Sequence, residues 1–220
     1  MINLDELKNI DKKLIERYST RYQKFGQDPK TLGWDNRTNQ EIRFKNASRN
    51  IVIDDKKILD IGCGFADFYQ FLLDSSGKTN FEYSGVDINP DLIGECSKRF
   101  PKSKFEIVNI LTDPERIGKE SYDIVSMFGV LNFKFSEIQN MDFAKSMINQ
   151  AFEYTKEVLV VDMLSKVIDS KYKPDDFVYY YEPAEMLQFA MTLTPHVALI
   201  QDYASIPQRE FVLQLRKNPV

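Results

Sequence analysis

The chain is constrained most by a regular alternation of strand-like and helix-like segments that begins near residue 56. Such alternation is typical of βαβ units, in which consecutive strands run parallel. One apolar run, Val-Leu-Val-Val at 158–161, has no polar residue, as expected for a strand that is buried on both faces. The sequence therefore predicts an α/β protein with a mostly parallel sheet. The expected strands are 58–61, 82–86, 105–110, 122–128 and 158–161, and the expected helices are 67–73, 90–100 and 142–155.

The C-terminal part departs from this alternation. Strand-like runs at 197–201 and 210–215 are joined by too few residues for a helix, so we expect them to pair antiparallel. Six parallel positions and one reversed strand then make up the sheet. Residues 165–184 are polar and aromatic, and we interpret them as an insertion on the substrate side of a main domain at 51–220.

The N-terminal part has a helical pattern. Residues 1–25 carry apolar side chains at helical spacing, and Asn3 with Glu6 forms a capping-box pattern at their start. A second helix is expected at 40–49, after a segment rich in turn-forming residues. We interpret residues 1–50 as a helical lid that covers the main domain.

Charge and composition exclude several classes of protein. Lys and Arg number 29 and Asp and Glu number 33, so the net charge is −4, without the positive field that attracts nucleic acids. No apolar run approaches the roughly 18 residues of a membrane-spanning helix. The first residues lack the apolar core of a signal peptide, and two cysteines are too few for a disulfide framework or a zinc site. We therefore expect a cytoplasmic protein without a nucleic-acid, membrane or metal partner, and the sequence does not determine its oligomeric state.

The strongest chemical signal is the stretch KKILDIGCGFADF at residues 56–68. A strand that ends in Gly62-x-Gly64 lets backbone amides approach a ligand without interference from a β-carbon. Open α/β sheets bind their ligands at the carboxyl ends of the strands. An acidic residue about 20 positions later is then expected to hold two ribose hydroxyls, and Asp87 lies 23 positions after Gly64. The pattern indicates a ligand that contains a nucleoside.

The residue at position 67 distinguishes between nucleoside ligands. A dinucleotide fingerprint has a third glycine there, but this chain has Asp67, which would repel a pyrophosphate at a cost of about several kcal/mol. S-adenosylmethionine has no phosphate, and its methionine half carries cationic ammonium and sulfonium groups. Acidic side chains at Asp60 and Asp67 therefore favour S-adenosylmethionine over NAD(P).

From about Lys56 to Arg216 the chain resembles the class I S-adenosylmethionine-dependent methyltransferases. DIGCGFA resembles the family's first motif, with Ala66 where many members have a third glycine. VDINP resembles the second-strand acid motif, while FEIVNIL and YDIVSMFGVLNF resemble the third- and fourth-strand motifs. The resemblance implies a single Rossmann-like, three-layer sandwich. Its sheet would have seven mostly parallel strands with an antiparallel C-terminal strand, beneath the N-terminal helical lid.

The resemblance also implies roles for residues around the adenosine. Asp87 would bind both ribose hydroxyls, and Ile88 would pack against one face of the adenine. Asn109 would accept a hydrogen bond from the adenine amino group, and the backbone amide of Ile110 would meet a ring nitrogen.

Another group would surround the methionine portion. Gly62 and Gly64 would contact it, and Asp60 would lie near its ammonium group. Residues 126–129, which include Phe128, would line its far side. Related small-molecule enzymes supply an arginine for the carboxylate from the helix before the first strand.

Arg43 is the candidate for that arginine, with Arg37 as the alternative. Methyl transfer is an in-line displacement, for which proximity and exclusion of water supply much of the rate. Asp162 directly follows the buried run, so its carboxylate could orient an amine or alcohol nucleophile, or it could cap a turn.

Aromatic residues outside the common sheet are candidates for the acceptor side. Tyr18, Tyr22 and Trp34 are expected in the lid over the cofactor, and Tyr22 is a second catalytic candidate. Tyr181, in the run at 179–181, is expected to contact the substrate.

The expected function is transfer of a methyl group to an oxygen or nitrogen of a small metabolite, such as a sugar or natural-product intermediate, with S-adenosylhomocysteine as the product. The chain has no [DN]PP[YF] tetrapeptide after the fourth strand and no Pro-Cys nucleophile, which argues against nucleic-acid substrates. Three alternatives stay open: methylation of a protein or polysaccharide, a non-catalytic adenosine-binding module, and, disfavoured by Asp67, an NAD(P) oxidoreductase.

Overall fold

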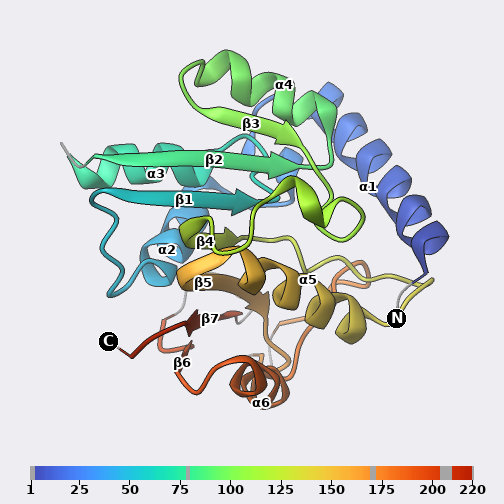
Figure 1. Cartoon of the computed structure of the whole chain (residues 1–220). Helices are drawn as coiled ribbons and strands as arrows, with labels where there is room; N and C mark the ends of the chain where they lie inside the picture. Colours follow the sequence, from blue (N-terminus) through green and yellow to red (C-terminus); the bar gives the residue numbers. More distant parts are fainter. Residues whose placement is uncertain (1–2, 78–79, 169–171, 204–209, 220) are drawn as a thin grey trace.

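The computed structural model describes residues 3–77, 80–168, 172–203 and 210–219. A seven-stranded sheet runs through these residues in the order β3-β2-β1-β4-β5-β7-β6 (Figure 1). The strands are β1 (Lys56–Ile61), β2 (Phe81–Asp87), β3 (Lys104–Ile107), β4 (Tyr122–Met127), β5 (Thr155–Leu164), β6 (Val197–Ile200) and β7 (Glu210–Arg216). The helices are α1 (Leu4–Phe25), α2 (Arg37–Ala47), α3 (Asp67–Ser76), α4 (Pro90–Arg99), α5 (Asn140–Tyr154) and α6 (Pro183–Leu193), with 3-10 turns η1 (Pro29–Leu32) and η2 (Pro114–Arg116).

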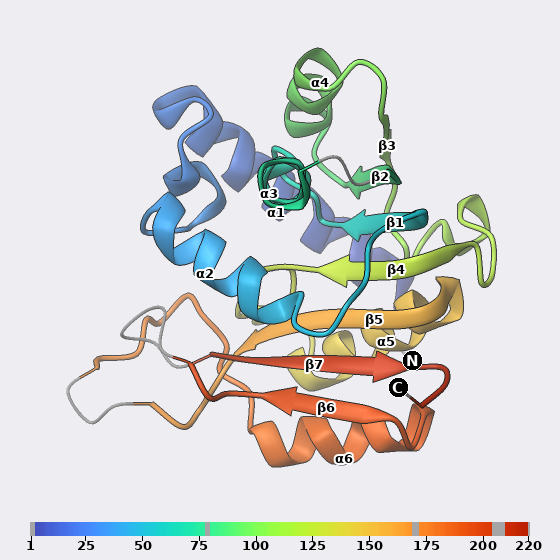
Figure 2. The same ribbon diagram turned by 90° about the vertical axis from the view of Figure 1, so that its left-hand side faces the viewer.

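One strand of the sheet is reversed. β1 pairs parallel with β2 and β4, and the β2–β3 and β4–β5 pairs are parallel as well. β7 pairs antiparallel with both β5 and β6, and its arrow in Figure 2 points against those of its neighbours. The prediction of a mostly parallel sheet with one antiparallel strand near the C-terminus is confirmed.

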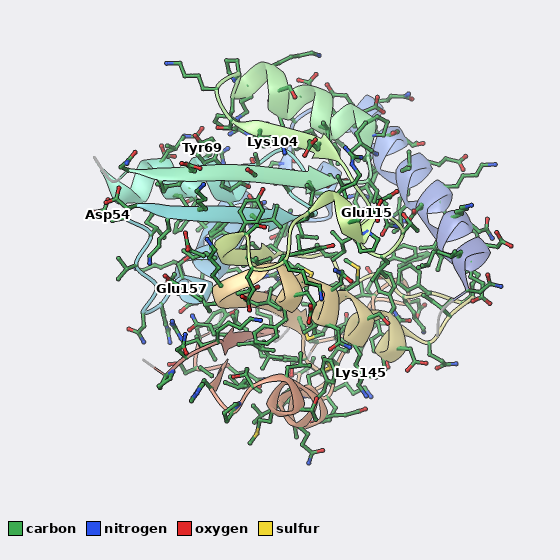
Figure 3. The ribbon with its side chains drawn as sticks, viewed as in Figure 1. Asp54, Tyr69, Lys104, Glu115, Lys145 and Glu157 are labelled. Atoms are coloured by element: carbon green, nitrogen blue, oxygen red, sulfur yellow. The ribbon has the colours of Figure 1, made fainter. Side chains whose placement is uncertain are left out.

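Each face of the sheet packs against helices, because side chains alternate between the faces along a strand. Leu59 and Ile61 of β1 belong to one buried cluster, together with residues of α5, α6 and the first half of α1. Ile58 belongs to a second cluster, with residues of α2, α3 and α4. Side chains fill the space on both sides of the sheet (Figure 3), which gives the expected three layers.

Helix α1 crosses the carboxyl ends of the strands (Figure 1). It begins with the predicted capping box of Asn3 and Glu6. The Asn89 side chain, after β2, donates a hydrogen bond to the Ile15 carbonyl (3.2 Å). Arg21 donates to the carbonyls of Thr31 and Lys30, which attaches η1 to α1. Together α1 and η1 form a cover over this edge of the sheet.

Some elements differ from the expected ones. Strand β3 ends at Ile107 rather than at residue 110, because the Asn109 side chain accepts a hydrogen bond from the Leu111 amide and turns the chain. The expected loop at 26–36 contains η1. Helix α6 was not predicted, although Pro183 at its first position and the buried Met186 and Ala190 one turn apart were available signals. None of the described helices combines the length and apolar content needed to cross a bilayer.

Candidate functional site

The loop after β1 requires glycine at two positions. Gly62 and Gly64 have positive φ angles of 71° and 56°. A β-carbon on Gly64 would come within 2.8 Å of a methyl carbon of Leu32, and one on Gly62 would collide with a methyl group of Val130. The Gly62 amide donates to the Val86 carbonyl (2.7 Å), which ties the loop to the end of β2. Glycine therefore lets the backbone reach a narrow space beneath η1.

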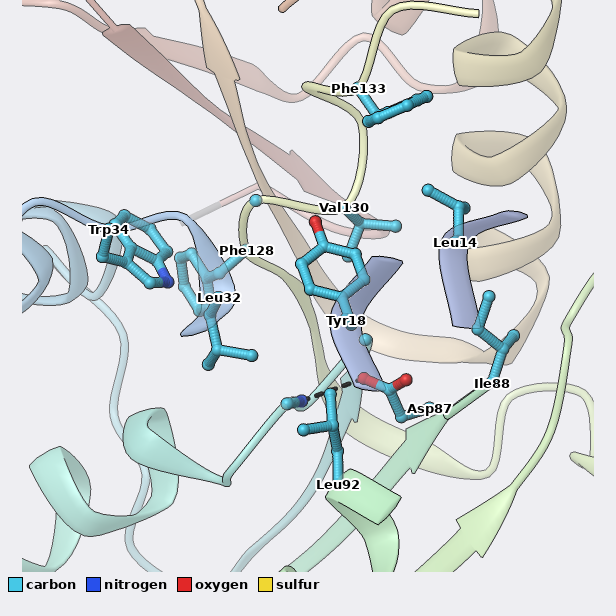
Figure 4. Close-up of a pocket in the computed structure, with 13 residues that line it drawn as sticks. Leu14, Tyr18, Leu32, Trp34, Asp87, Ile88, Leu92, Phe128, Val130 and Phe133 are labelled. Carbon is cyan, nitrogen blue, oxygen red and sulfur yellow. Dashed lines mark hydrogen bonds between the residues drawn. The ribbon is translucent and has the colours of Figure 1, made fainter. Parts of the chain in front are cut away.

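Asp87, the last residue of β2, faces the same space. Its Oδ2 accepts a hydrogen bond from the Gly64 amide (3.0 Å, dashed in Figure 4) and its Oδ1 accepts one from the Asn89 amide (2.9 Å). Burial raises the pKa of Asp87, and these backbone donors act against the rise. The carboxylate is thereby held in one orientation at the carboxyl edge of the sheet.

The glycine loop and Asp87 line a cavity of about 120 Å³. Eight residues expected at the site from the sequence line it: Tyr18, Trp34, Gly62, Gly64, Asp87, Ile88, Phe128 and Gly129. The sequence analysis missed five others, which are Leu14, Leu32, Leu92, Val130 and Phe133. Figure 4 shows Tyr18, Val130 and Phe128 gathered on one side of Asp87. The missed residues are apolar, and in the sequence nothing separates them from ordinary core residues.

Two residues expected around the adenine lie outside this cavity. The Asn109 side chain donates a hydrogen bond to Asp11 of α1 (2.7 Å). Ile110 is buried in the core beneath α1. The structure therefore places both behind the covering helix.

Asp60 lies in the sheet, below the glycine loop. It is 3% exposed, and its two oxygens accept hydrogen bonds from the hydroxyls of Tyr83 (2.5 Å) and Ser126 (2.8 Å). Burial raises the pKa of Asp60 to about 7 despite these donors. The Asp60 side chain therefore links β1 to β2 and β4 through these hydrogen bonds and does not line the cavity.

Arg43 and Asp162, expected to bind the methionine carboxylate and the nucleophile, bind each other instead. Arg43 Nη1 donates to Asp162 Oδ2 (2.6 Å), and the same guanidinium pairs with Glu210. The other oxygen of Asp162 accepts a hydrogen bond from the Gly129 amide (2.6 Å), and Arg43 stacks on Trp34 at 4.2 Å from the ring centre. Although the buried Nε of Arg43 has no hydrogen-bond partner, these contacts join α2, β5, β7 and the loop after β4.

The charges in this group determine each other's pKa. Burial alone would lower the pKa of Arg43, but the carboxylates of Asp162 and Glu210 outweigh it and raise the pKa. Burial raises the pKa of Asp162, with Arg43 acting against the rise. Two carboxylates around one buried guanidinium are consistent with a structural role for all three side chains.

Two tyrosines lie away from the cavity. Tyr22 packs against Phe65, with 5.7 Å between the ring centres. Tyr181 is 0% exposed, and its hydroxyl donates to the Leu131 carbonyl (2.8 Å). Tyr181 is therefore a core residue in this structure rather than a surface for substrate.

A second, wider cleft of about 410 Å³ adjoins the cavity. Five residues line both spaces: Tyr18, Leu32, Trp34, Gly129 and Phe133. The outer part of the cleft is bounded by Arg17 of α1 and by residues 175–178. In the part of the chain that the structure describes, no group of three or more His, Cys, Asp or Glu residues could hold a metal ion.

Comparison with known proteins shows which fold this chain shares. Residues 59–151 match the family model of the methyltransferase domain. The seven-stranded order with β7 reversed agrees with that match. This is the class I methyltransferase fold.

Solved structures share the methyltransferase fold at low sequence identity. Magnesium protoporphyrin IX methyltransferase (ChlM) from Synechocystis PCC 6803, with bound SAH, has a TM-score of 0.65 at 12% identity and covers 97% of this chain and 100% of its own. A SAM-dependent methyltransferase from Archaeoglobus fulgidus gives 0.57 at 14%, with coverages of 91% and 99%. The [4+2]-cyclase SpnF gives 0.59 at 12%, with coverages of 85% and 86%. None of the curated proteins matches this chain.

Proposed function

We propose that the protein is an S-adenosylmethionine-dependent methyltransferase that acts on an oxygen or nitrogen of a small molecule. The observation that carries the proposal is the position of Asp87 beside Gly62 and Gly64 in one cavity at the carboxyl edge of the sheet. A carboxylate there can accept hydrogen bonds from two ribose hydroxyls. The relatives solved with SAH or titled as SAM-dependent support the same cofactor.

The residues around the cavity fit an adenosine with a methionine chain. Ile88 follows Asp87 and presents an apolar side chain for the base, while Val130 and Leu32, which lie against the two glycines, would move aside for the chain of the ligand. S-adenosylmethionine would supply an electrophilic methyl group on its sulfonium sulfur. The acceptor oxygen or nitrogen attacks the methyl carbon in line with the C–S bond, which breaks to release S-adenosylhomocysteine, and the acceptor loses its proton. Tyr18, Trp34 and Phe128 would exclude water from the reacting groups.

The start of α3 argues against a dinucleotide. Asp67 is the first residue of that helix, where a Rossmann dehydrogenase binds pyrophosphate. Its oxygens are already engaged by Arg99 (3.1 Å) and Gln40 (3.3 Å). A pyrophosphate at this helix start would have to displace Arg99 and Gln40 from Asp67 and would then lie beside the Asp67 carboxylate.

The shape of the cleft supports a small acceptor. The cleft of about 410 Å³ opens directly onto the cavity and is closed on two sides by α1 and residues 175–178. Small-molecule sites have roughly 300–1,000 Å³, so the volume of the cleft suits one metabolite. The net charge of −4 agrees with an acceptor other than nucleic acid.

Calorimetric titration with S-adenosylhomocysteine, and with NAD in parallel, tests the cofactor. We expect the protein to bind S-adenosylhomocysteine and not NAD. Asp87→Ala should weaken the binding by more than about tenfold, because two charge-assisted hydrogen bonds are lost.

Asp91→Ala is the matched control, because Asp91 is an exposed acid in the first turn of α4, four positions from Asp87. It should bind S-adenosylhomocysteine like the unmodified protein. Equal affinities of the Asp87→Ala variant and the unmodified protein would contradict the ribose assignment. Methyl transfer itself is then measured as S-adenosylhomocysteine released in the presence of small amines and alcohols.

A further inference from the structure

We propose that the methyl acceptor carries an anionic group, which Arg17 holds at the outer end of the cleft. This inference rests on the proposed function, since it names the class of acceptor for the same site. The observation behind the inference is that Arg17 lies on two aromatic rings in the cleft that adjoins the proposed cofactor cavity.

Two aromatic rings form the platform under Arg17. The Arg17 guanidinium carbon lies 5.5 Å from the ring centre of Phe133 and 5.8 Å from that of Phe177. Phe133 bridges to Val178, and the Lys134 amide donates to the Phe177 carbonyl (3.1 Å). The backbone therefore holds the two rings together before any ligand binds. Stacking on rings orients a guanidinium and leaves its N–H donors free for an anion.

The cation has no carboxylate partner among the described residues. Arg17 forms no ion pair there, and neither do Arg21 and Lys30, which line the same cleft. Of these three, Arg21 donates its hydrogen bonds to the backbone carbonyls of Thr31 and Lys30. Three cations without a carboxylate partner in one cleft create a local positive potential.

Two acids also line the cleft, and both are engaged within their own turns. Asp35 accepts hydrogen bonds from the side chains of Asn36 and Asn39, and Asp175 accepts one from the Phe177 amide. Neither forms an ion pair with the cleft cations in the described residues. The negative charges of these two acids reduce the positive potential of the cleft. The cleft therefore favours a ligand with one anionic group over a ligand with several.

The cleft combines this cationic end with an apolar path to the cavity. Phe177 is 64% exposed, a large exposed fraction for an apolar ring, and Phe133 lines both the cleft and the cavity. Trp34 and Gly129 also line both spaces. A molecule with its anion on Arg17 and its apolar body on Phe133 would therefore direct its far end toward the methyl donor.

Titration of the protein saturated with S-adenosylhomocysteine tests the anion site. The probes are benzoate, phenyl phosphate and the uncharged benzamide, followed by NMR. We expect at least one anion to bind about tenfold or more tightly than benzamide, because a charge-assisted contact is gained. A stronger response to benzoate identifies a carboxylate acceptor, and a stronger response to phenyl phosphate identifies a phosphate ester.

Arg17→Gln should remove most of this preference, and Arg17→Lys, which keeps the charge, should preserve it. Lys12→Gln is the control, because it removes one exposed cation from the same helix without changing the cleft lining. The proposal is overturned if benzamide binds as well as both anions, or if Arg17→Gln leaves the preference unchanged. If S-adenosylhomocysteine does not bind while the Arg17-dependent preference persists in the free protein, the proposed cofactor is wrong and the anion site stands.

Discussion

Asp60 and Asp87 show how two buried carboxylates on neighbouring strands acquire different roles. Asp87 ends β2, so its oxygens meet loop amides and face the cavity. Asp60 lies one position before the end of β1, and its oxygens meet hydroxyls inside the protein. The strand end therefore separates an acid that faces the cavity from one that lies inside the protein.

The raised pKa of Asp60 predicts a pH-dependent stability. Burial raises it from 3.8 to about 7, so between these pH values the folded state holds a proton that the unfolded state has released. The contribution of Asp60 to the free energy of unfolding therefore falls as pH rises through this window. Asp60→Asn cannot ionise, so the stability of this variant relative to the unmodified protein should rise by about 2–3 kcal/mol from pH 5 to pH 8.

Urea unfolding of both proteins across this pH range measures the difference. Comparison with the variant cancels the contributions of Asp87 and Asp162, whose pKa values are also raised by burial. A difference in unfolding free energy that stays constant with pH would contradict the assignment.

At the scale of elements, α1 and η1 determine access to the cavity. The cavity of about 120 Å³ is smaller than the roughly 300 Å³ at the lower end of small-molecule sites. Leu32 of η1 lies over Gly64, and Leu14 and Tyr18 of α1 lie over the end of β2. Cofactor binding at this site therefore requires the cover to shift outward.

Leu32→Ala should make this shift easier. The smaller side chain frees space over Gly64, so a larger fraction of molecules is competent to bind. We expect S-adenosylhomocysteine to associate about three- to tenfold faster in stopped-flow measurements, since a required conformational change slows association. Leu73→Ala is the control, because Leu73 is 40% exposed on α3 and lines neither the cavity nor the cleft. An unchanged association rate for Leu32→Ala would show that η1 does not limit access.

At the scale of the whole molecule, the two core clusters share the strands of one sheet. Residues on opposite faces of β1 and β5 belong to different clusters, and the cavity proposed for the cofactor lies at the edge where these strands end. Binding at that edge therefore stabilises a unit to which both clusters contribute.

The melting temperature should report this coupling. At a concentration 100 times its Kd, S-adenosylhomocysteine adds about 2.7 kcal/mol, which corresponds to a rise of roughly 5–10 °C in Tm for a domain of this size. Differential scanning calorimetry should show one transition that moves with ligand concentration. Two transitions, of which only one moves, would contradict a single cooperative unit.

The sequence by itself predicted the alternation of strands and helices from β1 to β5, the reversed strand, and the meeting of Gly62, Gly64 and Asp87 at one edge of the sheet. Hydrophobic periodicity depends on residues close in the chain, and it placed Gly62, Gly64 and Asp87 at strand ends. Parallel strands bring their carboxyl ends to one edge, so these three residues had to meet. The start of helix α6 and the end of β3 were missed because they are marked by a proline and by an asparagine turn, which the pattern of apolar runs does not include.

Only the tertiary structure decided which partners the remaining candidates bind. Arg43 and Asp162 are 119 positions apart, and Asn109 is 98 from Asp11. Leu32 and Val130 reach the glycine loop from segments that have no strand or helix periodicity in common with it. Such contacts depend on how the helices pack against the sheet. A charged group that becomes buried there needs a partner of opposite charge, and that partner can come from any part of the chain. Local periodicity carries no information about which residues are brought together in this way.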